Sequence, residues 1–592
     1  MPLIRLALAQ INPTVGDLES NAELVLARTR QAADQGAHLV VFPEMALTGY
    51  PVEDLALRAS FVAASRSAMR RLAAQIAEQR TGHLAVVCGY LDRDADGVDK
   101  VGVPKGSPQN TAALLHQGQV IATYAKHHLP NYGVFDEFRY FVPGRTTCVA
   151  QLNGIDIALC ICEDLWQDGP AKAAKAAGAG LLLVINGSPY ERNKDDVRLA
   201  LCSDRAREAG CTLAYVNLVG GQDELVFDGD SIVVDQHGRL LARGPQFEEG
   251  LVMVDLDLPG ATPIDRVELE DNIGLRADYT VISPDPVRAY EPLRPTIAER
   301  LDDQAEAYAA IVLGLRDYVR KNGFTSVLLG LSGGIDSTLT AAIACDAIGA
   351  ANVYGVSNPS EYSSQHSKDD AAELARRTGL NLQTVSIAPL VDAFMAAVPL
   401  DGLAAENLQA RIRAVVWMAL SNQHGHLVLA CGNKSELAVG YSTIYGDAVG
   451  GFAPLKDVLK TEVWELARWR NDEAKRRGDT PPIPENTIAK PPSAELSPGQ
   501  LDSDLLPDYH LLDDLLDDYI ERDRGSAELV AEGFDREVVE GVLRMVDHAE
   551  YKRRQYPPGP KISVRNFGRD RRLPITNAWR EVAGEGNDNP SQ

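Results

Sequence analysis

The sequence predicts an α/β protein made of two successive units, and three observations support this. Apolar strand-like runs alternate with helical stretches over about the first 280 residues. Residues 282–295 then carry four prolines without periodicity, which is typical of a linker. A second strand–helix alternation starts near Thr296. We therefore expect one domain at residues 1–280, a linker at 281–295 and a second domain at 296–592.

In the first unit, apolar runs read as buried strands, and two hairpins turn on Gly-containing polar pairs. The runs lie at 3–10, 38–44, 83–91, 154–164, 180–187 and 211–221, the hairpins at 111–124 and 231–244, and the helical stretches include 21–35 and 195–210. The second unit opens with a helix and then repeats strand–helix pairs, which predicts a doubly wound parallel sheet.

Composition limits the classes of partner. The net charge of -25 repels a phosphate backbone, so nucleic acid is not expected as the main partner. No apolar run approaches the roughly 20 residues that cross a bilayer, and the N-terminus lacks a secretory-signal layout. The eight cysteines show neither a CxxC pair nor zinc spacing, so most are expected to be buried and reduced. A cytoplasmic location is the expectation.

Three segments of the first unit place a reactive side chain at or just past a strand end: Glu44, Lys126 and Cys162. Thiol-based amide hydrolysis needs a nucleophile, a proton acceptor and a group that stabilises the oxyanion. A carboxylate can take the thiol proton, and a lysine ammonium favours the thiolate. Taken singly, residues in such positions are more often a surface or capping acid, a solvated lysine and a core thiol. Strand alternation points Cys160 to the same side as Cys162 and does not choose between them.

Together these segments resemble the nitrilase superfamily over about residues 1–280. The resemblance implies an αββα sandwich and a catalytic triad of Glu44, Lys126 and Cys162. It selects Cys162 over Cys160, because the family's nucleophile directly precedes the acids of its motif, and it makes Glu137 the supporting fourth acid.

In glutaminase members of that superfamily, the residues that match Tyr132, Ser188 and Lys194 hold the substrate glutamine. A cation beside the glutamine carboxylate is physically sensible. The alternative for Ser188 is that it forms only a turn with the following proline.

The strongest motif of the second unit is the run Ser332, Gly333, Gly334, Ile335, Asp336 and Ser337 between an apolar strand and a helix. A Gly-rich turn lets backbone N–H groups approach phosphates, and the helix N-terminus adds partial positive charge. Asp336 can bind Mg²⁺. The run lacks the lysine of a Walker A loop. It resembles the PP-loop of the N-type ATP pyrophosphatases, which cut ATP between the α and β phosphates.

Residues 405–413 and 426–460 are rich in polar side chains around a further buried strand, where open α/β sheets bind ligands. Glu436 could be a second Mg²⁺ ligand beside Asp336. These segments resemble NAD synthetases over nearly the whole second half. The resemblance implies ATP contacts at Lys460, Ser493 and position 431, and deamido-NAD contacts at Asn407, Tyr441, Ser442, Thr443, Ile444, Asp447 and Lys552. Without this resemblance, Lys460 would be interpreted as a solvated lysine on a helix.

Two positions depart from that family's pattern. Asn358 stands where methionine is usual, and Cys431 stands where threonine often touches ATP, so this sequence lacks that hydroxyl. The two resemblances imply a glutamine-dependent ligase that uses Mg²⁺ and ATP, forms homo-oligomers and amidates deamido-NAD. The alternatives are another glutamine-dependent PP-loop amidoligase with a different carboxylate acceptor, a tRNA-thiolating enzyme, which the charge opposes, and a non-catalytic binding protein.

Overall fold

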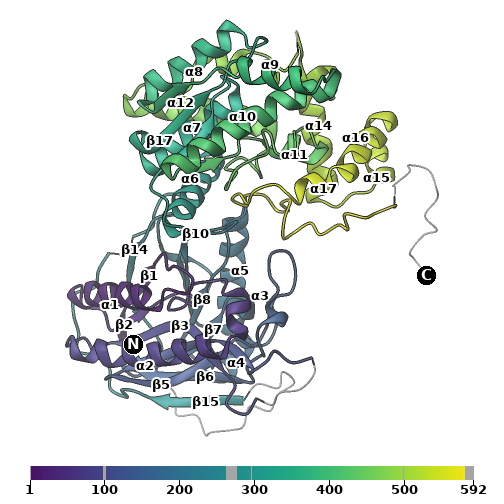
Figure 1. Cartoon of the computed structure of the whole chain (residues 1–592). Helices are drawn as coiled ribbons and strands as arrows, with labels where there is room; N and C mark the ends of the chain where they lie inside the picture. The colour runs from purple at the N-terminus through teal and green to yellow at the C-terminus, as the bar shows by residue number, and fades with distance from the viewer. Residues whose placement is uncertain (1, 98–101, 262–275, 295, 498, 580–592) are drawn as a thin grey trace. The chain divides into compact units, whose positions relative to one another are not determined.

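The computed structural model describes residues 2–97, 102–261, 276–294, 296–497 and 499–579 (Figure 1). The chain forms two compact units, Met1–Gln222 with Val226–Leu301, and Asp223–Leu225 with Asp302–Gln592. Val281, the first residue of the expected linker, is the last residue of strand β15. The helix expected to open the second unit begins at Asp303.

Two sheets form the centre of the first unit. One has the order β14 (Gly250–Asp257), β1 (Leu3–Gln10), β2 (Leu39–Val41), β3 (Ala85–Arg93), β4 (Pro108–His116) and β5 (Gln119–Ala125). The other has the order β13 (Leu240–Arg243), β12 (Ile232–Val234), β9 (Thr212–Asn217), β8 (Leu181–Asn186), β7 (Ile155–Ile161), β6 (Thr146–Leu152) and β15 (Arg276–Val281). Strands β10 (Val219–Gln222) and β11 (Leu225–Asp228) pair separately.

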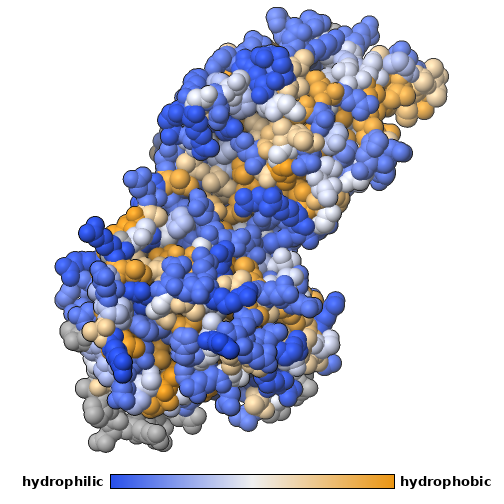
Figure 2. All heavy atoms as spheres, turned by 90° about the vertical axis from the view of Figure 1, so that its left-hand side faces the viewer, coloured by the Kyte–Doolittle hydropathy of each residue, from blue (hydrophilic) through white to orange (hydrophobic). Residues whose placement is uncertain are grey.

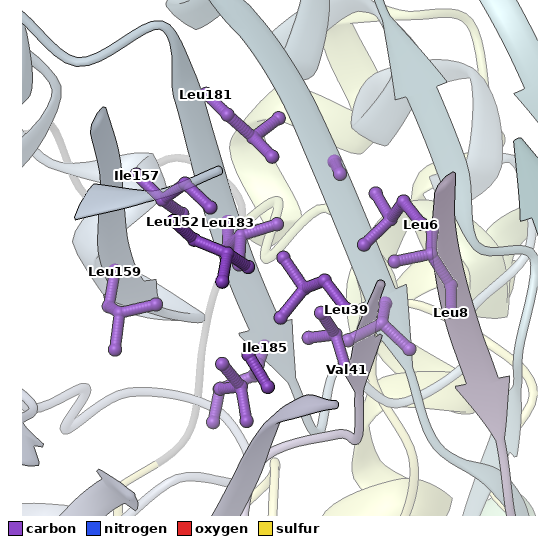
Figure 3. Packing of buried hydrophobic residues seen from close by; sticks show 14 of the residues in the cluster. Leu6, Leu8, Leu39, Val41, Leu152, Ile157, Leu159, Leu181, Leu183 and Ile185 are labelled. Carbon is purple, nitrogen blue, oxygen red and sulfur yellow. The ribbon is translucent and has the colours of Figure 1, made fainter. Parts of the chain in front are cut away.

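The two sheets pack face to face, with helices on their outer faces. Side chains such as Leu6 and Val41 of one sheet meet Leu159 and Ile185 of the other in a shared core (Figure 3). Helices α1 (Leu18–Asp34) and α2 (Ala59–Glu78) pack on the first sheet, and α4 (Pro170–Ala176) and α5 (Lys194–Ala209) pack on the second. This αββα sandwich confirms the predicted fold, and it buries apolar side chains on both faces of each sheet.

The second unit has a four-stranded parallel sheet in the order β18 (Asn381–Thr384), β17 (Val353–Ser357), β16 (Val327–Gly330) and β19 (Leu427–Leu429). Helices α6 (Asp303–Lys321), α7 (Ile335–Ile348), α8 (Gln365–Thr378), α9 (Ala388–Ala397), α10 (Gly402–His424) and α12 (Lys460–Arg477) accompany it (Figure 1). The predicted doubly wound sheet is confirmed. Strand order reverses between β16 and β19, and such a switch point is where open sheets bind ligands.

A helical cluster follows the sheet in the chain. It comprises α11 (Lys434–Val439), α14 (Tyr509–Leu516), α15 (Ser526–Ala531), α16 (Arg536–His548) and α17 (Glu550–Arg553), whereas α13 (Glu485–Ala489) packs on α7, α8 and α12. Apolar residues of α11, α14 and α16, among them Leu437, Leu512 and Val542, share one core. This core fixes α11, which directly follows the carboxyl end of β19.

The face drawn in Figure 2 is mostly hydrophilic, with smaller hydrophobic areas between the hydrophilic ones. Within the described ranges, no helix combines the length and the apolar character needed to span a membrane.

Candidate functional sites

The first site is a buried cluster of charges at the ends of strands in the first unit. Lys126, which follows β5, places its Nζ 2.8 Å from Glu44 Oε1 and 2.9 Å from Glu137 Oε1. The side chains of all three are at most 3% exposed. Buried charges persist only when they are paired and hydrogen-bonded, and here two carboxylates share one ammonium.

The carboxylate of Glu44 is held at both oxygens. Oε1 also accepts a hydrogen bond from Asn110 Nδ2 at 2.6 Å, and Oε2 accepts one from the backbone N–H of Gly187 at 2.7 Å. A carboxylate oxygen has two acceptor sites, so Oε2 retains capacity for a proton. Gly187 directly precedes Ser188, so the expected base is tied to the turn expected to bind substrate.

Cys162 sits just after β7 in a strained turn, with φ 47° and ψ -96°. Its thiol packs with Leu159 and Ile161 in the core between the sheets, whereas Cys160 packs with Ala158 under the helices. The expectation that both cysteines point to the same side was wrong. The strand ends at Ile161, and the positive φ of Cys162 breaks the alternation.

The charges of this cluster act on one another. Burial and the carboxylate of Glu44 raise the pKa of the Cys162 thiol well above its ordinary value, while the Lys126 ammonium opposes the shift. Burial lowers the pKa of Lys126, but Glu137 and Glu44 outweigh it and raise that pKa overall. Burial raises the pKa of Glu137 to about 7. Thiolate formation therefore requires a nearby base, and Lys126 stays charged.

The three residues expected to bind glutamine differ in exposure. Ser188 is 3% exposed, and its backbone N–H and C=O both bond the side chain of Asn217. Tyr132 is 56% exposed and donates to Glu163 Oε2 at 2.8 Å. Lys194 begins α5 and is half-buried. Tyr132 reaches the acid next to Cys162, and Ser188 reaches Glu44 through Gly187.

Sequence reasoning missed several polar side chains around the first cluster. Asn110 and Tyr50 bond Glu44 and Glu137 respectively, the latter at 2.9 Å. Asp164 is fully buried behind Cys162. Asp164 follows the nucleophile in the motif and could have been singled out, whereas nothing in the sequence distinguishes Asn110 from other strand asparagines.

The second site begins with the Gly-rich turn between β16 and α7. Gly334 caps α7, and its N–H bonds Ser332 Oγ at 3.1 Å. Gly333 has φ +80°, and a Cβ there would lie 2.2 Å from the backbone oxygen of Ser367. Only glycine fits this position, because both the dihedral and the close approach exclude a side chain. The turn presents backbone N–H groups at a helix N-terminus, as anion binding requires.

Two carboxylates meet one lysine beside that turn. Lys460 Nζ lies 2.5 Å from Asp336 Oδ2 and 3.2 Å from Glu436 Oε1, and the Lys460 side chain is 2% exposed. Its burial is inconsistent with a solvated surface lysine. Burial and the neighbouring charge of Asp336 raise the pKa of Glu436 to about 8. Asn433 Nδ2 donates to Asp336 Oδ1 at 2.8 Å and fixes its orientation.

The residues expected to contact deamido-NAD gather around the loop after α11. Thr443 donates from Oγ1 to Asn407 Oδ1 at 2.7 Å and from its backbone to Asp447 Oδ1 at 2.7 Å. Lys552 Nζ donates to the backbone oxygens of Gly440 and Ser442, each at 2.8 Å. Tyr441 donates to Asp502, and Ile444 O accepts from Arg411. A hollow of about 310 Å³ lies beside Lys552.

The remaining positions have defined surroundings. Ser493 Oγ donates to Gln500 O at 2.5 Å and accepts from the backbone of Glu495. Cys431 follows β19, and burial raises the pKa of its thiol to about 12, so it is a neutral group. Asn358 accepts from Trp417 Nε1 at 2.6 Å and donates to Val385 O at 3.0 Å. This explains a buried amide where the family pattern has methionine.

Comparisons with known proteins also distinguish two parts of the chain. A family model described as carbon-nitrogen hydrolase matches residues 5–266, and one described as NAD synthase matches residues 307–556. The chain is therefore a two-domain enzyme that joins a carbon–nitrogen hydrolase domain to an NAD synthase domain.

Relatives that match over their full length identify the class of this two-domain enzyme more closely. The glutamine-dependent NAD(+) synthetases of Xylella fastidiosa and Acinetobacter baylyi are 44% and 42% identical over 586 residues, covering 98% of this chain and 99% of each relative. The structure of the glutamine-dependent NAD+ synthetase from Acinetobacter baumannii in complex with ADP is similar, with a TM-score of 0.71, 41% identity and coverage of 98% and 99%. The chain belongs to the glutamine-dependent NAD(+) synthetases, carbon–nitrogen ligases that use glutamine as amide donor.

Proposed function

We propose that Cys162, Glu44 and Lys126 release ammonia from glutamine in the first unit. Glu44 takes the thiol proton at Oε2 as the sulfur attacks the amide carbon, and the Lys126 ammonium stabilises the oxyanion. Ammonia leaves with the proton returned by Glu44, and water then cleaves the glutamyl thioester to give glutamate. The arrangement that supports this is the buried ammonium of Lys126, shared by Glu44 and Glu137.

Tyr132, Ser188 and Lys194 are proposed to hold the glutamine backbone. Ser188 belongs to a rigid turn, because Asn217 and the buried Arg198 bond its backbone groups. Glutamine bound at this turn is connected to the proposed base Glu44, since the backbone nitrogen of Gly187 lies 2.7 Å from Glu44 Oε2. The turn therefore aligns a bound amide with respect to both Glu44 and Cys162.

In the second unit we propose that ATP and deamido-NAD react at the carboxyl ends of β16 and β19. The turn from Ser332 to Ser337 binds phosphate, with Lys460, Ser493 and residue 431 also contacting ATP. The nicotinate carboxylate attacks the α-phosphorus, pyrophosphate leaves, and ammonia displaces AMP from the adenylate to give NAD. Asn407, the Tyr441–Ile444 stretch, Asp447 and Lys552 are the proposed contacts to deamido-NAD.

Asp336 and Glu436 have the chemistry of a Mg²⁺ site, since both present carboxylate oxygens to a single cation, Lys460 Nζ. When bound, Mg²⁺ would neutralise phosphate charge. Lys460 supplies a fixed positive charge at the same place. No group of three or more metal-ligating side chains exists among the residues that the structure describes, so phosphate oxygens and water would complete the coordination.

Three wider features are also proposed. Ammonia reaches the second site without mixing with solvent, because protonation to ammonium would remove its nucleophilic lone pair. The enzyme forms a homo-oligomer in which α9 contacts another copy, since Leu390 and Phe394 lie one helical turn apart on α9 and are 48% and 45% exposed. It acts in the cytoplasm, where its eight free thiols stay reduced.

The deciding experiment is Cys162→Ala, assayed for AMP and pyrophosphate with glutamine or with ammonium salt. We expect the glutamine-driven rate to vanish and the ammonium-driven rate to stay at the wild-type level. The neighbouring Cys160→Ala is the matched control and should retain both rates. Loss of both rates in a folded Cys162→Ala protein would contradict the division of labour. A different acceptor that replaces deamido-NAD with equal kcat/KM would favour the other PP-loop amidoligases.

A further inference from the structure

Asp164 lies two residues after Cys162, in the short helix α3 (Glu163–Trp166), and its exposure is 0%. A fully buried carboxylate needs several donors to offset its desolvation. The groups that bond Asp164 come from the two segments that carry Cys162 and Lys126.

One oxygen of Asp164 holds the segment after Lys126. Oδ1 accepts hydrogen bonds from the backbone N–H groups of His127 and His128, at 3.1 and 2.8 Å. These two residues directly follow Lys126 in the chain. The course of the backbone just beyond Lys126 is therefore fixed by Asp164.

The other oxygen holds the strand before Cys162 and the strand before Lys126. Oδ2 accepts from the backbone N–H of Ile161 at 3.0 Å and from the hydroxyl of Tyr124 at 2.7 Å. Ile161 directly precedes Cys162, and Tyr124 lies two residues before Lys126. One carboxylate thus joins both segments, each within two residues of the reactive side chain.

We propose that Asp164 is a positioning residue of the glutaminase site, which fixes the ammonium of Lys126 opposite the thiol of Cys162. The inference rests on the proposed glutaminase function. Glu44 and Glu137 bind the same ammonium, but each contacts only the end of the lysine side chain. Asp164 contacts the backbone on which that side chain is mounted.

Only a carboxylate suits this position. All three backbone groups can only donate, so an amide in place of the carboxylate would turn its NH₂ toward at least one backbone N–H, whichever way it is oriented. Asp164→Asn therefore releases either the segment after Lys126 or the turn before Cys162. A displacement of about 1 Å in a reacting group lowers rates by about 10²-fold.

The test is Asp164→Asn in the full-length enzyme. We expect kcat for glutamine hydrolysis to fall about 10²-fold, with little change in KM, because Asp164 does not line the glutamine turn. The ammonium-driven rate should stay at the wild-type level. Alkylation of Cys162 by iodoacetamide should become slower. The pH dependence of the alkylation rate should shift to higher pH, because a displaced Lys126 stabilises the thiolate less.

Asp255→Asn is the matched control, because Asp255 is a buried acid of the same unit that bonds Arg5 Nε at 2.9 Å, Tyr290 and Leu293 N. It should lose stability while keeping kcat and the alkylation profile of the wild type. Tyr124→Phe removes one donor of Asp164 and keeps the shape of the ring. It should lower kcat several-fold and shift the alkylation profile in the same direction.

The outcomes separate the inference from the function on which it rests. A wild-type enzyme that releases no glutamate from glutamine, or that still releases it after Cys162 is alkylated, would overturn the proposed function. If the wild type is active and Asp164→Asn matches Asp255→Asn in kcat and alkylation, the positioning role is wrong. If Asp164→Asn does not fold, Tyr124→Phe decides: wild-type values overturn the inference, and a lower kcat with a shifted profile supports it.

Discussion

At the residue scale, the pKa of Glu137 links the glutaminase site to stability. Burial raises this pKa to about 7, and its Oε2 is buried without a hydrogen-bond partner. The unfolded chain releases the same proton near pH 4.5. Folding therefore takes up a proton between these two pH values, and the contribution of Glu137 to the free energy of unfolding falls as pH rises through them.

We expect Glu137→Gln to flatten the dependence of the free energy of unfolding on pH. The measurement is urea unfolding of the full-length enzyme at several values between pH 5 and pH 8. Above the pKa of the folded protein the two curves should run parallel. The exposed Glu78 offers Glu78→Gln as a control that retains the wild-type slope. An equal slope in Glu137→Gln would contradict a raised pKa at this position.

Asn358 gives a second prediction at this scale, because it is 7% exposed and its side chain makes two hydrogen bonds. Asn358→Leu would leave the indole N–H of Trp417 without its acceptor, at a cost of about 1–3 kcal/mol. We expect urea unfolding to show a loss in this range. Asn322→Leu, at an exposed helix end, should change stability by less than about 0.5 kcal/mol. If Asn358→Leu left the free energy of unfolding unchanged, the asparagine that replaces the family's methionine would have no structural role.

At the element scale, the turn between β16 and α7 depends on one glycine. Gly333→Ala adds a Cβ that would lie 2.2 Å from Ser367 O, at a φ of +80°. Gly323→Ala has a similar φ of +77° but meets nothing within 4 Å. Both variants bear the left-handed strain of about 1–2 kcal/mol. Only Gly333→Ala must also displace the turn or α8.

We therefore expect Gly333→Ala to lose pyrophosphate release by at least about 10²-fold, with glutamine and with ammonium alike. Alkylation of Cys162 should proceed at the wild-type rate, since the first unit is untouched. Gly323→Ala should keep its activity and lose only stability. Equal rates in the two variants would mean that the turn does not position phosphate.

Periodicity predicted the elements whose side chains are uniformly apolar. The runs at β1, β7 and β8 are buried on both faces and were recognisable as strands. Strand β15 was not predicted, because its sequence RADYTV mixes charged and apolar residues at the edge of a sheet. The pairing of the two sheets came only from the family resemblance, since alternation does not say which face meets which.

The sites show a similar division. The triad and the Gly-rich turn stand in recognisable motifs, and the structure brings Glu44 and Lys126 into contact. The side chain of Cys162 was misplaced relative to Cys160, because a positive φ at a strand end leaves no mark in composition. Asn110, Tyr50 and Asp164 act through hydrogen bonds between distant segments, and such contacts follow from topology rather than from local pattern.

At the scale of the whole molecule, the proposed direct transfer of ammonia makes the two nitrogen sources respond differently to pH. Free ammonium loses about tenfold in its reactive base form for each unit of pH below its pKa. Ammonia released at Cys162 starts as the neutral base and, when kept from solvent, escapes this dilution. The ratio of glutamine-driven to ammonium-driven NAD formation should therefore rise as pH falls from 8 to 6.

The measurement uses the wild type and Cys162→Ala at equal concentration, with saturating ATP and deamido-NAD and fixed total glutamine or ammonium. Cys162→Ala supplies the ammonium-driven curve without glutaminase, and adding an enzyme that consumes free ammonia tests for leakage. With direct transfer, the glutamine-driven rate persists in the presence of that enzyme, and its pH profile follows the thiol chemistry of the first site. A constant ratio, together with loss of the glutamine-driven rate to the ammonia-consuming enzyme, would place the ammonia in bulk solvent between the two reactions.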